Sequence, residues 1–144
     1  MNEQTIPPPD AELHALDRLV GIWRISGGAE GTTSFRWMEG GRFLIQEGEL
    51  SRDGREFKVL EIIGREKPWG AKEPGSQIKS RAYTDLGDTL DYVYEVDGEV
   101  VTVWAGAKGS PTFCKITVSP DGQTMTSGWE WPGGGYKAEA TRIA

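Results

Sequence analysis

The sequence predicts an all-β protein, an antiparallel up-and-down β-barrel of about eight to ten strands with one short N-terminal helix. Short β-rich segments follow one another about every ten residues, with no long helical pattern between them. Many joints carry glycine, and Asp53-Gly54, Asp97-Gly98 and Asp121-Gly122 are typical of tight hairpins. Strands joined by hairpins form an antiparallel sheet, and closing that sheet removes its exposed edges. A two-sheet sandwich shares these signals and stays an alternative.

The N-terminal segment precedes the strands. Residues 1–10 form an arm in which Pro7-Pro8-Pro9 cannot join a helix or a strand ladder. Asp10 is a good N-cap for a helix over residues 11–18, whose leucines share one stripe. We expect residues 11–144 to form one barrel domain. The expected strands are 19–27, 31–39, 42–50, 56–65, 77–84, 89–96, 99–106, 112–118, 124–131 and 135–142.

A Gly-x-Trp motif lies at the start of the first strand. Gly21 lets the chain turn sharply where a Cβ would clash. Trp23 follows two residues later and therefore points to the same face of the strand, where one large ring can close the end of a barrel. We expect the later strands to close around this ring.

One connection, residues 67–76, is longer than a hairpin loop and contains Trp69. Two interpretations are open. The segment is a flap over a barrel mouth, or it is a surface loop held by one packed indole.

Composition and charge exclude several classes of function. The 144 residues carry a net charge of −6, from 22 acidic and 16 basic residues, which argues against a nucleic-acid surface. There is no polybasic segment, no apolar run of the roughly 20 residues that a membrane span needs, and no signal-peptide pattern. Cys114 is the only cysteine and forms no internal disulfide. We therefore expect a cytoplasmic monomer or homodimer whose partner is a small molecule.

The leading helix, Gly21 and Trp23 on the first strand, the strand succession and a basic residue near the end resemble the calycin group. That group contains lipocalins, fatty-acid-binding proteins and nitrobindins. The segment Phe35-Arg36-Trp37-Met38-Glu39-Gly40-Gly41-Arg42-Phe43-Leu44 is most similar to bacterial lipocalin-like proteins of unassigned function. The resemblance spans about residues 11–143 and implies a barrel fold that hosts many ligands. It also implies that Arg142 lies over the ring of Trp23, as a structural contact.

Cofactor and metal chemistry lack the necessary residues. Nitrobindins bind haem through a late histidine, whereas His14 on the leading helix is the only histidine here. A lone cysteine such as Cys114 is typical of a small core residue. One histidine and one cysteine do not supply a zinc site or a nucleophilic triad. We therefore expect no cofactor and no metal.

Alternation along each strand predicts which side chains face the barrel interior, with the more apolar face turned inward. Strands 56–65 and 99–106 remain ambiguous, because both of their faces are apolar. Charged residues share the predicted inner faces, and such charges require pairing or a hydrated cavity. The predicted ligand-binding residues are Trp37, Phe43, Ile45, Glu47, Glu61, Arg81, Tyr83, Tyr92, Tyr94, Trp104 and Trp129.

Three functions are compatible with this pattern. The first is binding of a small hydrophobic or aromatic molecule in the barrel interior. The second is a cofactor-free acid–base enzyme of the isomerase, cyclase or lyase type, with Glu47 or Glu61 as the general base. The third is a non-catalytic scaffold with a solid barrel. An interior cavity would favour the first two, and a carboxyl without a fixed cation would favour catalysis.

Overall fold

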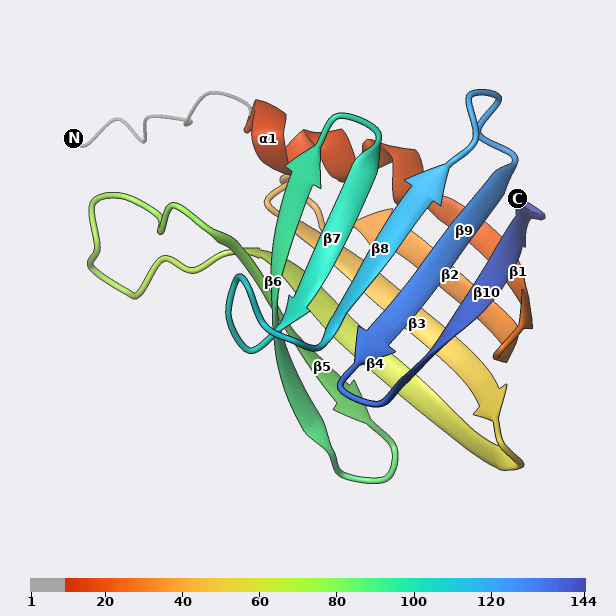
Figure 1. Cartoon of the computed structure of the whole chain (residues 1–144). Helices are drawn as coiled ribbons and strands as arrows, with labels where there is room; N and C mark the ends of the chain where they lie inside the picture. Colours follow the sequence, from red (N-terminus) through yellow and green to blue (C-terminus); the bar gives the residue numbers. More distant parts are fainter. Residues whose placement is uncertain (1–9) are drawn as a thin grey trace.

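Ten antiparallel strands form a closed barrel with a short helix at one end (Figure 1). The computed structural model describes residues 10–144, so the predicted polyproline-like arm lies almost wholly outside the described residues. Each strand pairs with its neighbour in the chain, and β1 pairs with β10 to close the sheet. The predicted fold class is confirmed, and the sandwich alternative is wrong. The strands are β1 (Gly21–Gly27), β2 (Glu30–Trp37), β3 (Phe43–Arg52), β4 (Arg55–Arg65), β5 (Ile78–Thr84), β6 (Thr89–Asp97), β7 (Val100–Ala105), β8 (Phe113–Val118), β9 (Thr124–Trp131) and β10 (Gly134–Arg142).

The helical segment consists of α1 (Ala11–His14) and a 3₁₀ helix, η1 (Ala15–Leu19). It lies across one end of the barrel (Figure 1). The side chains of Leu13, Leu16 and Leu19 are buried in the core, so the leucine stripe faces the barrel as predicted. Because the 3₁₀ turn extends to Leu19, the first strand begins two residues later than the sequence indicates.

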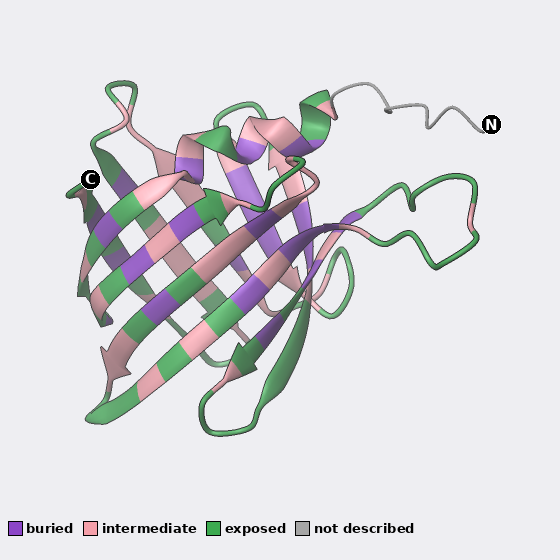
Figure 2. Ribbon diagram, turned by 180° about the vertical axis from the view of Figure 1, so that it is seen from behind, coloured by how far each residue is buried: buried purple, intermediate pink, exposed green. Residues whose placement is uncertain are grey.

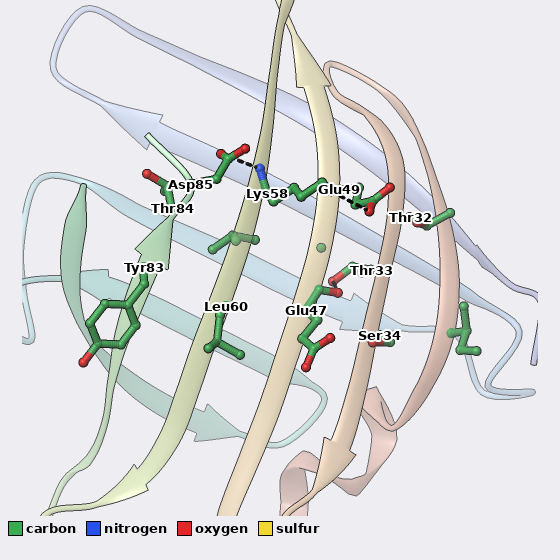
Figure 3. Close-up of a pocket in the computed structure, with 13 residues that line it drawn as sticks. Thr32, Thr33, Ser34, Glu47, Glu49, Lys58, Leu60, Tyr83, Thr84 and Asp85 are labelled. Atoms are coloured by element: carbon green, nitrogen blue, oxygen red, sulfur yellow. Dashed lines mark hydrogen bonds and ion pairs between the residues drawn. The ribbon is translucent and has the colours of Figure 1, made fainter. Parts of the chain in front are cut away.

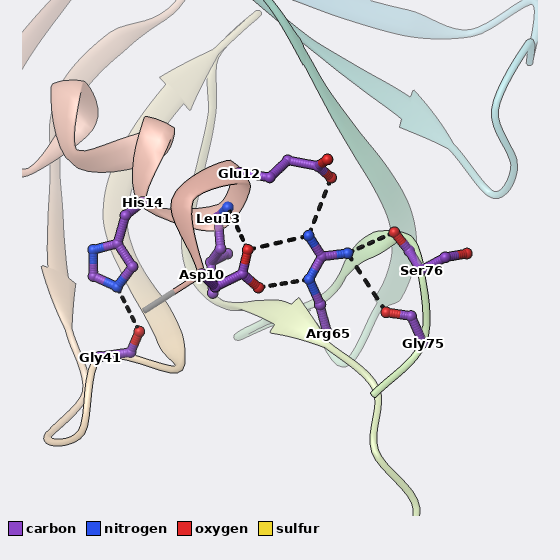
Figure 4. Close-up of polar contacts among 8 residues, drawn as sticks. All are labelled: Asp10, Glu12, Leu13, His14, Gly41, Arg65, Gly75 and Ser76. Carbon is purple, nitrogen blue, oxygen red and sulfur yellow. Dashed lines mark hydrogen bonds and ion pairs between the residues drawn. The ribbon is translucent and has the colours of Figure 1, made fainter. Parts of the chain in front are cut away.

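An arginine at the end of β4 anchors the start of this helix (Figure 4). Arg65 Nε donates to Asp10 Oδ2 at 2.6 Å, and its Nη2 donates to Glu12 Oε1 at 3.2 Å. Asp10 also caps the helix, since its Oδ1 accepts from the Leu13 N–H at 3.0 Å. The hydrogen bond from Arg65 is the main reason that the pKa of Asp10 lies below its usual value.

Trp37, predicted to bind ligand, instead belongs to this capped end. Its ring stacks on His14 with centroids 4.1 Å apart, and its Nε1 donates to Asp17 Oδ1 at 2.6 Å. His14 Nε2 lies 2.8 Å from the carbonyl oxygen of Gly41 (Figure 4). Both side chains therefore hold the helix on the barrel.

Trp23 closes the barrel beneath the helix. Its side chain is fully buried, and its Nε1 donates to the carbonyl of Leu19 at 2.9 Å. The Arg142 guanidinium carbon lies 4.3 Å from the centre of the Trp23 ring, so the contact implied by the family resemblance is present. Arg142 also donates to the Val20 carbonyl. Gly21 has φ +135°, and a Cβ there would collide with the Arg142 side chain, so glycine is required.

The long connection, residues 67–76, projects away from the barrel (Figures 1 and 2). Its base lies at the capped end, since Arg65 Nη1 donates to the carbonyl of Ser76. The Trp69 side chain is completely exposed (104 %). Both interpretations of this segment are therefore wrong, because it does not cover the open end and its indole is not packed.

Buried and exposed residues alternate along most strands (Figure 2). The buried set runs from the leucines of the helix through Trp23 into the barrel. No helix within residues 10–144 is long and apolar enough to cross a membrane.

Candidate ligand-binding cavity

The barrel interior contains a cavity of about 300 Å³ to which all ten strands contribute side chains. Most of its lining is apolar. The aromatic rings that line it come from separate strands, β2, β4, β6, β9 and β10, and include Phe35, Phe57, Tyr92, Trp129 and Tyr136. The rings of Tyr92 and Trp129 lie 5.8 Å apart. A mainly apolar cavity with a few polar groups is the usual form of a small-molecule site.

Glu61 is the carboxyl group of this cavity. It lies in the middle of β4, and only 5 % of its surface is exposed. Ser80 Oγ on β5 and Tyr94 Oη on β6 each donate to Glu61 Oε2 at 2.6 Å. Within residues 10–144, no side chain or backbone group donates to the other oxygen, Oε1. Burial raises the pKa of Glu61, and the two hydroxyl groups only partly oppose this effect.

The neighbouring titratable groups are neutral over the physiological range. Burial raises the pKa of Tyr92, and it raises that of Tyr94 well above the ordinary value. Burial raises the pKa of the Cys114 thiol to about 12. Among the described residues that line the cavity there is no lysine, arginine or histidine. Glu61 is thus the group in the cavity whose charge changes nearest to neutral pH.

The cavity borders on solvent at the end away from the helix. Leu90 lines it there and is 45 % exposed. At the same end the guanidinium carbon of Arg52 lies 4.1 Å from the ring centre of Tyr136 and 5.4 Å from that of Trp131. Arg52 reaches from β3 to the Tyr136 ring on β10 and is not among the residues that line the cavity.

The structure brings part of the predicted site together. Glu61 on β4, Tyr92 and Tyr94 on β6 and Trp129 on β9 all line the cavity. The ambiguous strand 56–65 therefore has the parity that places Glu61 inside, and exposed Leu60 lies on its outer face.

The predicted orientation of β3 is wrong. Phe43, Ile45 and Glu47 face away from the cavity, while Gln46 and Leu50 line it. Glu47 is 56 % exposed, and its Oε1 lies 3.2 Å from Arg36 Nη2. Figure 3 shows Glu47 in a broad groove on the outer face of the sheet. The inner face of this strand carries the fully buried Leu44 as well as Gln46 and Leu50, while the acidic Glu47 and Glu49 on the other face remain in water.

The predicted orientation of β5 is also wrong. Arg81 lies on the outer surface, where its Nε donates to Asp91 Oδ1 at 2.7 Å. Tyr83 is exposed in the same outer groove as Glu47 (Figure 3). Small side chains, Ala82 and Thr84, line the cavity instead. Within residues 10–144, Glu61 therefore has no arginine partner.

The sequence left open which face of β7 points into the barrel. Val103 lines the cavity, so Trp104 points outward, where its ring centroid lies 5.2 Å from that of Phe113. Trp104 is therefore not a cavity residue. The prediction of a cavity role for Trp104 is wrong.

The sequence interpretation missed Ser80, Gln46 and Tyr136. Ser80 lies on the inner face of β5, and a signal in the sequence could have shown which residues of this strand face inward. Arg81 and Asp91 are directly opposite in the β5–β6 pairing, and opposite charges in such positions favour the same exposed face.

The groove in Figure 3 is wider than the cavity but lies on the surface. Its charged residues already have partners, since Lys58 Nζ lies 3.6 Å from Glu49 Oε1 and the Lys58 N–H donates to Asp85 Oδ1 at 2.9 Å. Interactions of this kind are stable in water without a ligand. The interior cavity is therefore the better candidate site.

Comparison of the chain with family models and with curated proteins gave no match. The class of protein is thus defined by the fold, a closed ten-stranded antiparallel β-barrel with a short helix, which is consistent with a calycin-like barrel. Within residues 10–144, no group of three or more histidine, cysteine, aspartate or glutamate side chains is arranged to hold a metal ion.

Proposed function

We propose that this protein is a calycin-like barrel that binds a small apolar or aromatic molecule in its interior. The observation that supports this function is the cavity of about 300 Å³, lined mainly by apolar and aromatic side chains and bordered by solvent at one end. Such a space favours a ligand over a solid scaffold, since protein interiors are otherwise closely packed. The Trp23–Arg142 contact beneath the helix adds to the resemblance to calycins.

Filling the cavity with a protein side chain should abolish binding. Ser127 on β9 lines the cavity, and its neighbour Thr126 is exposed on the outer face. We expect Ser127→Phe to place a ring in the space that a ligand needs, and Thr126→Phe to place the same ring outside. The probe is 1-naphthylmethanol, a neutral aromatic molecule, with calorimetric titration as the measurement. The wild type should bind it with a dissociation constant of roughly 10 µM to 1 mM.

The two variants separate binding in the cavity from binding to the surface. Ser127→Phe should lose the binding heat, whereas Thr126→Phe should keep the wild-type affinity. Near-ultraviolet circular dichroism of both variants checks that the barrel is folded. Equal loss in the two variants, or no loss in Ser127→Phe, would contradict an interior site. Native mass spectrometry of the purified chain then searches for a co-purified natural ligand.

A second function, acid–base catalysis, is favoured by the surroundings of Glu61. Its carboxyl is buried among rings and hydroxyl groups and has no cationic partner among the described residues, and burial raises its pKa above the ordinary value, which makes it a stronger base than an exposed carboxylate. Glu47 no longer qualifies, because it is exposed and paired with Arg36.

Proton exchange tests this second function. A bound methyl ketone such as 1-acetonaphthone exchanges its α-protons with heavy water when a base removes them. If Glu61 is such a base, the wild type should accelerate the exchange seen by NMR, and Glu61→Gln should return it to the rate without protein. Binding without acceleration would leave the protein a binding module.

A further inference from the structure

The electrostatics of the cavity restrict the charge of its ligand. Glu61 is the carboxyl group in the lining, and no basic side chain accompanies it among the described lining residues. An anionic ligand would enter a mainly apolar space without a counter-ion, which costs free energy through desolvation, and an ionised Glu61 would add repulsion. Arg52 does not relieve this, since it stacks on Tyr136 at the rim. The cavity therefore accepts neutral or cationic ligands and rejects anions.

The hydrogen bonds of Glu61 leave one oxygen for a ligand. Ser80 and Tyr94 both donate to Oε2, from β5 and β6. Within residues 10–144 Oε1 has no donor, and Glu61 lines the cavity. Two hydroxyl groups that already donate to Oε2 are placed to stabilise the carboxylate when it is charged. A charged carboxylate can accept one further donor on Oε1, and because Glu61 lines the cavity, a group bound there can supply it.

We infer that the ligand is an organic amine with an aromatic or apolar body, whose ammonium group donates to Glu61 Oε1. This inference rests on the proposed binding function and names the class of its ligand. The rings of Tyr92 and Trp129 offer faces that attract a cation. The net charge of −6 also favours the approach of cations over anions.

Binding of an ammonium group is coupled to the ionisation of Glu61. Burial favours the protonated carboxyl in the empty cavity, so the proton leaves Glu61 for the solvent when the cation enters, and a carboxylate–ammonium pair remains. The groups that face Glu61 are Ser80 on β5, Tyr92 and Tyr94 on β6 and Cys114 on β8. The two tyrosines and the cysteine titrate well above neutral pH, so they do not contribute to this coupling.

Three matched probes test the inference. They share the naphthalene ring and differ in charge: 1-naphthylmethylamine is a cation, 1-naphthylmethanol is neutral and 1-naphthoic acid is an anion. In calorimetric titrations near neutral pH, the amine should bind the wild type roughly 10- to 100-fold more tightly than the alcohol, the range for a hydrogen bond to a charged group. The acid should show no binding. Amine affinity should rise with pH above the ordinary carboxyl value of 4.5 until Glu61 is ionised in the empty cavity, whereas alcohol affinity should show no such rise.

Glu61→Gln should remove the preference for the amine over the alcohol. Glu47→Gln, a matched change on the outer face of β3, should leave all affinities unchanged. If the alcohol binds the wild type at least as tightly as the amine, or if Glu61→Gln keeps the preference, the amine assignment is wrong while the binding function stands. If none of the three probes binds, the binding function is wrong as well. Wild-type selectivity decides the question even where the Glu61 variant does not fold.

Discussion

Replacing Trp23 by alanine is expected to lower the free energy of unfolding by about 3–5 kcal/mol, the range for large-to-small changes at buried aromatic sites. The indole is fully buried between the strands and the helix. Its removal leaves a cavity, takes the hydrogen bond from the Leu19 carbonyl and takes the ring from beneath Arg142. Equilibrium unfolding in urea, followed by circular dichroism, measures the change.

Trp69→Ala is the control for that measurement. The same residue type is replaced, but this indole is completely exposed on the projecting connection. Its loss should change the free energy of unfolding by less than about 0.5 kcal/mol. Similar losses in the two variants would show that the barrel end is not held by the buried ring.

The fold could be predicted because its signals are local. The hairpin dipeptides fix where strands end, and the Gly-x-Trp motif fixes how the first strand enters the barrel. A positive φ at Gly21 and a clash at its missing Cβ are the structural counterparts of that motif. The hairpin signals depend on neighbouring residues in the chain, whereas the partner of the clash at Gly21 is the distant Arg142, which only the closed barrel brings there.

The orientation of β3 and β5 was predicted wrongly because the large rings of Phe43 and Tyr83 counted for more than the charged side chains on the same faces. Turning the more apolar face inward is correct where the core is solid, as at Trp23. The inner face of β3 carries the buried Leu44 together with Gln46, and the inner face of β5 carries the buried Ile78 and Ala82, whereas the charged Glu47 and Arg81 lie outside. Large side chains such as Phe43 then lie outside. Phe43 packs over Gly64 on the next strand, where a Cβ would collide with its ring.

Glu61→Gln is expected to raise the stability of the empty protein in a pH-dependent way. Burial places the pKa of Glu61 in the folded protein above the ordinary carboxyl value of 4.5. Between these two pKa values the folded state binds more protons than the unfolded state, so wild-type stability falls as the pH rises through this interval. Glutamine does not titrate and retains an oxygen that can accept from Ser80 and Tyr94. The variant should therefore avoid this loss.

The difference in stability between variant and wild type should be small near pH 4 and should grow toward neutral pH by up to about 1.4 kcal/mol per pH unit within the interval. Urea unfolding of both proteins at several pH values measures this difference.

The lowered pKa of Asp10 has the opposite effect, with stability lost toward acid pH, but it is common to both proteins and cancels in the difference. Glu47→Gln, the same change on the exposed outer face of β3, is the matched control variant. A constant difference between Glu61→Gln and the wild type from acid to neutral pH would mean that Glu61 ionises in the folded cavity as readily as in the unfolded chain. The amine ligand would then displace no proton, and its affinity would not depend on pH over this interval.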